Sequence, residues 1–142
     1  MGDRRVAREL ALQALFSLDM GKKIPINNVD ERLNEFCAGN EDKLTKGVKP
    51  FFLELVKGVN ENHSEIDFFL DKYSKNWKIS RMPVVDRNIM RIATFEFIKY
   101  SDIPNSVTIN EAVEIGKKYG TRDSGPFING VLDRIKNLEN FK

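Results

Sequence analysis

Apolar residues recur along this chain at intervals of three and four, the spacing that places side chains on one face of an α-helix. The pattern predicts a first helix over residues 4 to 20. Its apolar face consists of Ala7, Leu10, Ala11, Ala14 and Leu18. The pattern stops at Gly21, and Ile24-Pro25 also disfavours helix, because a residue before proline avoids the helical region.

Three further helices are predicted in the stretch that follows. Asn28-Val-Asp-Glu31 has the form of a capping box, which predicts a second helix that begins with a side-chain hydrogen bond. Pro50 suits the first turn of a third helix, where its missing N–H costs nothing, and this helix is expected to end near His63. Ser64-Glu-Ile-Asp67 is a second box-like sequence and predicts the start of a fourth helix.

The most apolar helix is predicted over residues 84 to 100. As expected of a helix that others surround, it has only a narrow polar stripe, which consists of Arg87, Arg91 and Thr94. Thr108 is predicted to cap the next helix, with Glu111 at the box position, and Gly120 to end it. The last helix is expected to begin at residue 123 or 124.

No segment alternates with period two for long enough to predict a strand, and no repeat is visible. We therefore predict an all-α fold of about seven helices in two packed helical-bundle subdomains, with three helices over about residues 1–63 and four over about residues 64–142. No linker rich in proline, glycine or serine separates the two. They are expected to share one core within a single domain over residues 1–142.

Composition agrees with one ordered domain, because 41% of the 142 residues are hydrophobic and 31% are charged. The net charge of +2 is too small for the whole surface to attract a polyanion, so any nucleic-acid contact must come from local clusters of basic side chains. The single cysteine, Cys37, excludes an intramolecular disulfide. Glu9 and Gln13 interrupt the N-terminal apolar stretch, unlike in a signal peptide, so we expect a cytoplasmic protein without membrane segments.

Residues suited to catalysis are few. The lone His63 stands in Asn-Glu-Asn-His-Ser between two predicted helices, where a solvated residue is expected rather than a general base or a metal ligand. Cys37 falls on an apolar helix face and is expected to be a small core residue. The sequence has no Walker loop, dinucleotide fingerprint or nucleophile elbow. We therefore expect no enzyme, no cofactor and no metal site.

The first helix carries a candidate binding face. At about 100° per residue, Arg4, Arg5 and Arg8 share one side of it, which is either a solvated charged face or a phosphate-binding arm. Leu12 and Phe16 lie near the arginines and far from the apolar stripe. Either they are exposed and form a partner surface, or the C-terminal half of the chain covers them.

A second basic group precedes the last helix and consists of Lys117, Lys118 and Arg122. The first N–H groups of that helix are free to meet an anion, which makes a phosphate site reasonable there. Phe127, in the first turn of the helix, either folds under it or stacks on an unpaired base.

Two carboxylates of the central helix require an explanation. Glu96 shares a face with apolar residues, so it needs a hydrogen-bond donor, either around Thr108–Asn110 or from an arginine. Asp86 lies at the start of the helix, where it is either open to a partner or part of a surface ion pair.

Several stretches together resemble one known family. They are Arg4-Arg5-Val-Ala-Arg8, Ala11-Leu-Gln-Ala-Leu-Phe16, Trp77, Val85-Asp-Arg-Asn88, Ile109-Asn-Glu-Ala-Val113 and Phe127-Ile-Asn-Gly-Val-Leu-Asp133. The chain is similar over nearly its whole length to the NusB family of bacterial transcription antitermination factors. This resemblance implies an all-helical, non-enzymatic protein that joins the ribosomal protein NusE and binds single-stranded boxA RNA of nascent ribosomal RNA transcripts. It also implies assembly with other Nus factors on RNA polymerase.

The resemblance also implies roles for individual residues. RNA-backbone contacts fall on Arg4, Arg5 and Arg8, and a base contact falls on Phe127, near Asp123 and Ser124. A charge reversal at Arg8 is accordingly expected to weaken RNA binding and to leave thermal unfolding nearly unchanged.

The NusE surface implied by the resemblance includes Phe16 and Asp86, to which helix geometry adds Leu12. Pro126 stands where relatives place a basic residue, so one phosphate contact is expected to be missing.

Two alternatives to this function stay open. One is a NusB-like domain of the kind fused to RNA cytosine methyltransferases, which the end of the chain at Lys142 disfavours by length. The other is a helical interaction module that forms a homodimer through the same face and masks the arginines.

Overall fold

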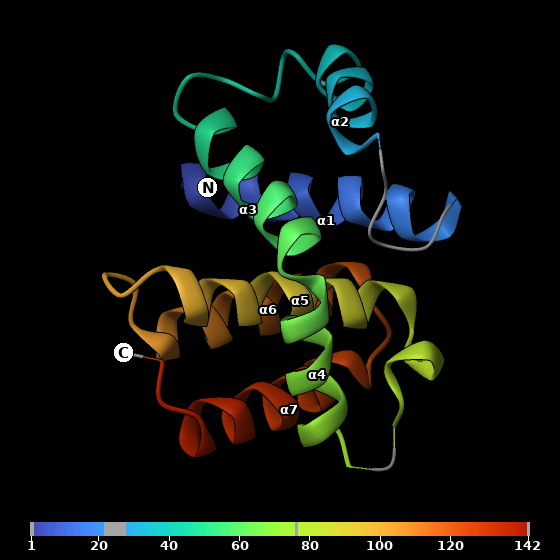
Figure 1. Ribbon diagram of the computed structural model, residues 1–142. Coiled ribbons are helices and arrows are strands. Elements are labelled where there is room, and N and C mark those ends of the chain that lie inside the picture. The colour runs from blue at the N-terminus through green and yellow to red at the C-terminus, as the bar shows by residue number, and fades with distance from the viewer. Residues whose placement is uncertain (1, 22–27, 76, 142) are drawn as a thin grey trace.

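The computed structural model describes residues 2–21, 28–75 and 77–141 (Figure 1). Over these residues the chain forms seven α-helices, one short 3-10 helix and no strand, which confirms the predicted all-α fold. In chain order the elements are α1 (Asp3–Gly21), α2 (Val29–Ala38), α3 (Lys49–Glu61), α4 (His63–Tyr73), η1 (Ile79–Arg81), α5 (Val84–Lys99), α6 (Asn105–Tyr119) and α7 (Ser124–Leu138). Ile24 and Pro25, which contributed to the predicted end of the first helix, lie outside the described residues. Among the helices described, none is both long and apolar enough to cross a membrane.

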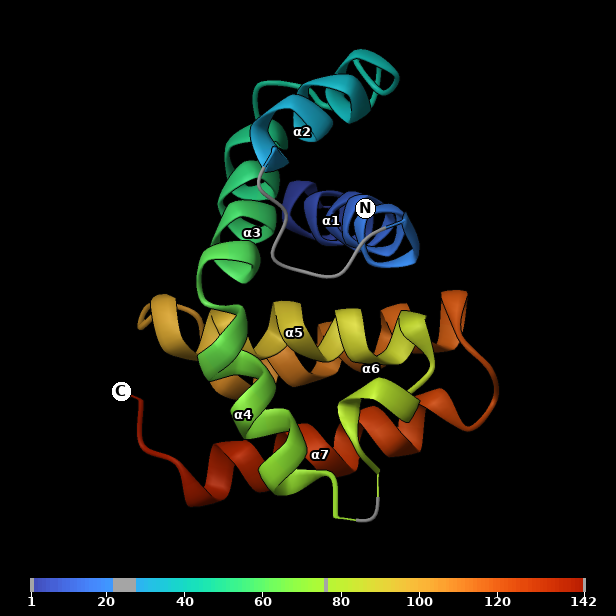
Figure 2. The ribbon, with the colours of Figure 1, turned by 45° about the vertical axis from the view of Figure 1, so that its right-hand side comes forward.

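Helix α5 is the centre of the arrangement, as its apolar sequence predicts. It packs against α1, α3, α4, α6 and α7. In both ribbon views α1, α2 and α3 lie on one side of α5 and α7 lies on the other (Figures 1 and 2). One continuous cluster of buried apolar side chains draws residues from all seven described α-helices. The division into subdomains of about residues 1–63 and 64–142 stays a prediction.

Most helices begin close to their predicted starts, and Gly120 ends α6 as predicted, but the predicted N-terminal caps are wrong. Helix α2 follows Asn28 as expected, yet the Asn28 side chain makes no capping hydrogen bond within the described residues. Helix α4 begins at His63, so Ser64 lies inside it rather than before it. Helix α6 begins at Asn105, directly after Pro104, and Thr108 is buried within its first turns. Of the residues that resembled caps or completed a capping box, Thr108 and Asp67 have partners on another helix instead.

Two residues of the polar stripe of α5, Arg87 and Arg91, pair with carboxylates of two neighbouring helices. Asp19 of α1 accepts hydrogen bonds from Arg87 Nε at 2.7 Å, Asn88 Nδ2 at 2.8 Å and Arg91 Nη1 at 3.0 Å. Burial would raise the pKa of Asp19, but these hydrogen bonds and the charges of the arginines lower it on balance. Arg91 Nε also donates to Asp67 of α4 at 2.9 Å. The predicted cap residue Asp67 therefore joins α4 to α5.

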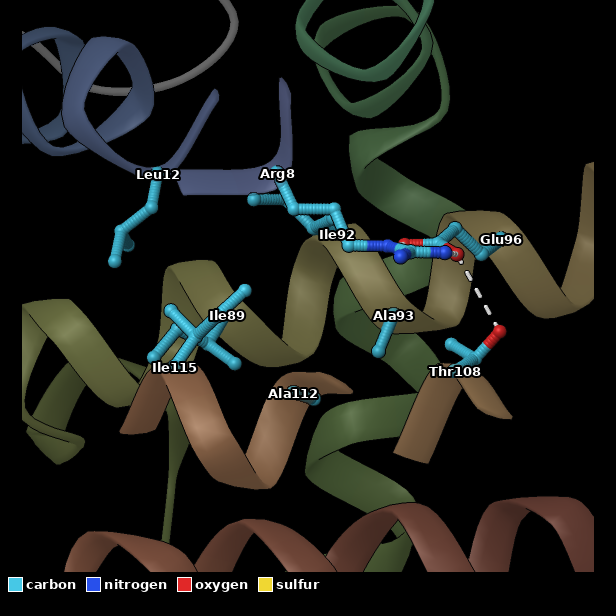
Figure 3. Close-up of a pocket in the computed structure, with 9 residues that line it drawn as sticks. All are labelled: Arg8, Leu12, Ile89, Ile92, Ala93, Glu96, Thr108, Ala112 and Ile115. Carbon is cyan, nitrogen blue, oxygen red and sulfur yellow. Dashed lines mark hydrogen bonds and ion pairs between the residues drawn. The ribbon is translucent and has the colours of Figure 1, made fainter. Parts of the chain in front are cut away.

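A buried ion pair holds α1 against α5 (Figure 3). Glu96 is 1% exposed and Arg8 is 4% exposed. Arg8 donates to both carboxylate oxygens of Glu96, from Nε at 2.9 Å and from Nη2 at 2.7 Å. Thr108 Oγ1 of α6 donates to the same carboxylate at 3.3 Å. Both donors predicted for Glu96, an arginine and the start of α6, are thus present.

The predicted exposed face of the first helix is partly covered. Leu12 is 2% exposed and points toward Ile89 of α5 and Ile115 of α6 (Figure 3). Together with Arg8, these side chains line a cavity of only about 10 Å³, so the three helices are closely packed here. The alternative in which the C-terminal half covers this face is confirmed for Leu12, and the prediction that Arg8 is exposed is wrong. A charge reversal at Arg8 would place two carboxylates together in the core.

Replacement of Arg8 by alanine should destabilise the protein by about 3–5 kcal/mol, because Glu96 would keep a buried charge with only Thr108 as its donor. The matched control is Arg4→Ala, whose side chain is 54% exposed and lies 4.0 Å from Asp102. We expect a change below about 1 kcal/mol for this control. Urea unfolding followed by circular dichroism measures both effects. Equal midpoints for the two variants would show that the Arg8–Glu96 pair does not stabilise the fold.

Candidate nucleic-acid interface

Two of the N-terminal arginines on α1, Arg5 and Arg8, donate hydrogen bonds to one carboxylate on α6. Arg5 donates to Glu111 from Nε at 2.7 Å and from Nη2 at 2.5 Å. Arg8 also donates to Glu111, from Nη1 at 3.3 Å. The hydrogen bond from Arg5, aided by the charge of Arg8, holds the pKa of Glu111 below its usual value. Glu111 therefore pairs with arginines rather than completing a capping box.

The three predicted RNA-binding arginines differ in their accessibility. The Arg4 side chain is 54% exposed, with its guanidinium 5.1 Å from the centroid of the Phe51 ring. The Arg5 side chain is 27% exposed at the edge of its pair with Glu111. Arg8 cannot reach a phosphate without breaking its bonds to two carboxylates. The predicted RNA contact by Arg8 therefore disagrees with the folded structure, and Arg4 is the most accessible of the three.

The second basic group lies at the end of α6. The Lys117 side chain is 62% exposed, and its Nζ lies 3.3 Å from Glu114. Lys118 Nζ donates to Glu9 of α1 at 2.7 Å, and the Tyr119 hydroxyl donates to the same carboxylate oxygen at 2.6 Å. Burial, followed by the hydrogen bond to Glu9, raises the pKa of Tyr119. The end of α6 is thus fixed to α1 while both lysines remain accessible.

Hydrogen bonds through Ser124 hold the turn between α6 and α7. Ser124 Oγ accepts from the backbone N–H of Thr121 at 3.0 Å and donates to Asp86 Oδ1 of α5 at 2.7 Å. Gly120 is needed for this geometry, because a Cβ atom there would lie 2.3 Å from Ser124 Oγ. Ser124 is only 1% exposed. It therefore positions the turn, and the prediction that it borders RNA directly disagrees with its burial.

Asp86 is buried too, with 3% of its surface exposed. Burial raises the pKa of Asp86, and the hydrogen bond from Ser124 only partly opposes this shift. Neither a surface ion pair nor an exposed partner contact, the two possibilities left by the sequence, describes this environment. Of the three residues predicted to contact NusE, Leu12 and Asp86 are buried, and Phe16 is 38% exposed.

The remaining residues of the turn are accessible. Arg122 and Asp123 are exposed, and neither forms an ion pair within the described part of the chain. Phe127 is half-buried, and its ring meets Trp77 edge-on with 6.3 Å between the centroids. The two rings line a pocket of about 310 Å³ together with Pro83, Asp86, Thr121 and Asp123. Phe127 is therefore one wall of an open pocket.

The arrangement suits binding of a polyanion that carries aromatic bases. Exposed cations and the start of α7 can contact phosphates, and the aromatic pocket can hold a base.

The two residues considered for catalysis or metal binding are both partly buried. His63 is half-buried, with Nδ1 3.2 Å from the carbonyl oxygen of Asn60. Cys37 is half-buried as well. In the described ranges no three His, Cys, Asp or Glu side chains are grouped so that they could hold a metal ion.

Sequence reasoning missed the partners of Glu9 and Glu111 and the place of Trp77 beside Phe127. A carboxylate within the apolar run of α1 was a signal for a buried partner of Glu9. Nothing local connected Glu111 to the arginines, which lie about a hundred residues earlier. For Trp77, the signal is that the only tryptophan of the chain stands in a polar connection between two helices.

The pKa of Asp86 predicts how stability depends on pH. Because the folded protein raises this pKa, the charge of Asp86 costs stability above the folded pKa, and the cost disappears below the unfolded value of about 3.9. Asp86→Asn should therefore raise the Tm at pH 7, and the gain should vanish below about pH 4. Calorimetry at both pH values, with the exposed Asp123→Asn as control, measures this. A Tm below that of the wild type at pH 7 would contradict the prediction.

Comparisons with known proteins agree with the fold. The NusB family model matches residues 5–137. The transcription antitermination protein NusB of Desulforapulum autotrophicum is 59% identical over 140 residues, which are 99% of this chain and 95% of that protein. The solved structure of T. maritima NusB has a TM-score of 0.83 at 37% identity and covers 96% of this chain and 93% of its own. A chain in the crystal structure of antitermination factors NusB and NusE in complex with dsRNA has a TM-score of 0.82 at 26% identity, with coverage of 96% and 98%. A family model over most of the sequence and a relative of such high identity place this chain in the NusB family.

Proposed function

We propose that this protein is a transcription antitermination factor that binds single-stranded boxA-type RNA of nascent ribosomal RNA transcripts together with the ribosomal protein NusE. It acts in the cytoplasm without catalysis, as one of several Nus factors on RNA polymerase. Two comparisons support the proposal. A 59% identical relative is a transcription antitermination protein NusB, and a chain of the same fold occurs in a complex of NusB and NusE with dsRNA.

The observation that carries the RNA part is the exposed turn between α6 and α7. Lys117, Lys118 and Arg122 offer accessible cations there, and Phe127 offers an aromatic surface within the same short segment. Cations release counterions from RNA phosphates on binding, and aromatic rings stack on unpaired bases. Pro126, exposed in the first turn of α7, has neither a charge nor an N–H to offer.

The N-terminal arginines make a smaller contribution in this proposal. Arg4 contacts the RNA backbone, and Arg5 does so from the edge of its pair with Glu111. Arg8 supports them from the core through Glu96.

For NusE we propose a surface on the outer face of α1. Phe16 is 38% exposed, and Met20, one turn further along the helix, is 63% exposed. Exposed apolar side chains at i and i+4 are typical of a helix face that meets a partner protein. Leu12 and Asp86 take part only indirectly, because Leu12 is buried between α1, α5 and α6 and Asp86 fixes the turn between α6 and α7.

Fluorescence anisotropy of a labelled boxA-like RNA tests the proposal, with a scrambled RNA as control and with and without NusE. We expect a preference for the boxA-like sequence that NusE sharpens. Failure to bind RNA under either condition, while NusE still associates, would instead indicate a protein-interaction module. Loss of RNA binding at high protein concentration would favour the homodimer that masks the arginines.

A single cation supplies a sharper prediction. Arg122→Ala should weaken RNA binding and reduce the slope of log K against log salt by about 0.7, the value for one phosphate contact to a single strand. Lys43→Ala is the matched control, because Lys43 is exposed in the connection between α2 and α3, outside the proposed surface. Anisotropy titrations at several salt concentrations give both slopes. An unchanged slope for Arg122→Ala would remove Arg122 from the interface.

A further inference from the structure

Trp77 is a large aromatic side chain on the surface, with 51% of its area exposed. Its backbone is nevertheless held in place, because the Ser74 hydroxyl donates to the Trp77 carbonyl oxygen. Two residues further along, the backbone N–H of Ile79 donates to the Asp71 carboxylate at 2.8 Å. A fixed and exposed tryptophan is a common feature of binding sites, because it offers a large apolar surface at little cost in conformational entropy.

The pocket beside Trp77 has the size and shape for one planar group. Its volume of about 310 Å³ lies at the lower end of the range for small-molecule sites, about 300–1,000 Å³. The Trp77 and Phe127 rings lie at 65° to each other, so a planar ligand in the pocket can stack on one ring and meet the other edge-on.

The ionisable groups that line the pocket are both carboxylates. Asp86 already accepts a hydrogen bond from Ser124, whereas Asp123 is exposed and has no ion pair in the described part of the chain. An ionised carboxylate only accepts hydrogen bonds. It therefore favours a planar ligand with an exocyclic amino group over one with a carbonyl oxygen at the same edge.

We propose that Trp77 and Phe127 form a subsite for one unpaired RNA base that carries an amino group, with the Asp123 carboxylate as the acceptor of that group. Adenine, cytosine and guanine meet this requirement, and uracil does not. This inference rests on the proposed RNA-binding function. It adds Trp77 to the interface and gives the subsite a base preference.

The positions of two helices favour a nucleotide over a lysine or arginine side chain from a partner protein. The pocket lies where α5 and α7 both begin, because Pro83 and Asp123 are the residues that precede them. The positive ends of two helix dipoles disfavour a cation there and favour an anionic strand. Arg122, adjacent to Asp123 in the turn, can pair with the phosphate that accompanies the base.

The experiment uses Trp77 itself as the reporter, since it is the only tryptophan of the chain. The full-length protein is titrated with two labelled single-stranded RNAs of equal length, one of uracil only and one with amino-bearing bases interspersed. Tryptophan fluorescence and anisotropy of the RNA label are read in parallel. We expect tighter binding of the mixed RNA, with quenching of Trp77 on binding.

The variants separate stacking from base preference. Trp77→Ala should weaken binding of the mixed RNA about tenfold or more, whereas Trp77→Phe should retain most of the affinity. Asp123→Asn should reduce the preference for the mixed RNA, because an amide can also donate to a carbonyl oxygen of uracil. The matched control is Phe68→Ala on α4, which removes an aromatic side chain that is 60% exposed. Thermal unfolding shows whether each variant is folded. If the alanine variant is not, the quenching of Trp77 in the wild type and the changed base preference of Asp123→Asn carry the test.

The outcomes distinguish this inference from the function on which it rests. RNA binding by the wild type without any change in Trp77 fluorescence, and with Trp77→Ala equal to Phe68→Ala, would overturn the subsite and leave the proposed function intact. Loss of NusE binding by Trp77→Ala with RNA binding unchanged would make the pocket a protein-docking site and also overturn it. Failure of the wild type to bind either RNA would overturn both.

Discussion

Glu96 lies in the middle of the protein with 1% of its surface exposed, and a carboxylate buried there without partners would cost several kcal/mol. Its donors come from two other helices, Arg8 of α1 and Thr108 of α6. The requirement to satisfy this one charge therefore fixes α1 and α6 relative to α5. Apolar contacts alone would tolerate small shifts between the helices, whereas two hydrogen bonds from one guanidinium to one carboxylate define position and orientation.

The same interaction decides where positive charge reaches the surface. Arg8 is held in the core and Arg5 is paired with Glu111, so only part of the arginine-rich start of the chain can meet an anion. Lys117 and Arg122 lie outside this network, and Lys118 pairs with Glu9 while its side chain stays 53% exposed. With a net charge of only +2, this local placement matters more than the total charge.

The helices could be predicted from the sequence because their apolar period is local information. Helices α1 and α5 match their predicted ranges closely, and α7 begins at residue 124 as predicted. Caps could not be predicted equally well, since a polar side chain near a helix start has distant competitors. Asp67 and Thr108 look like cap residues in sequence but bind Arg91 and Glu96. For the same reason, a helical projection correctly places Arg8 and Arg4 on one face of α1. It cannot show that α5 and α6 cover the edge of that face on which Arg8 lies.

The sequence predicts which residues belong to the candidate site more readily than it predicts how they are arranged on the surface. Phe127 and the cations near it were identified from their places in the sequence, and the structure brings them together at one turn. Side-chain hydrogen bonds to two other helices hold that turn, and no local sequence pattern shows them. Glu9 of α1 binds Tyr119 just before it, and Asp86 of α5 binds Ser124 just after it. Because both ends of the turn are fixed in the folded protein, the proposed RNA binding there has to order only side chains, which lowers the entropic cost of association. The buried polar residues thus determine the surface of the protein, because they hold the backbone that carries the exposed side chains.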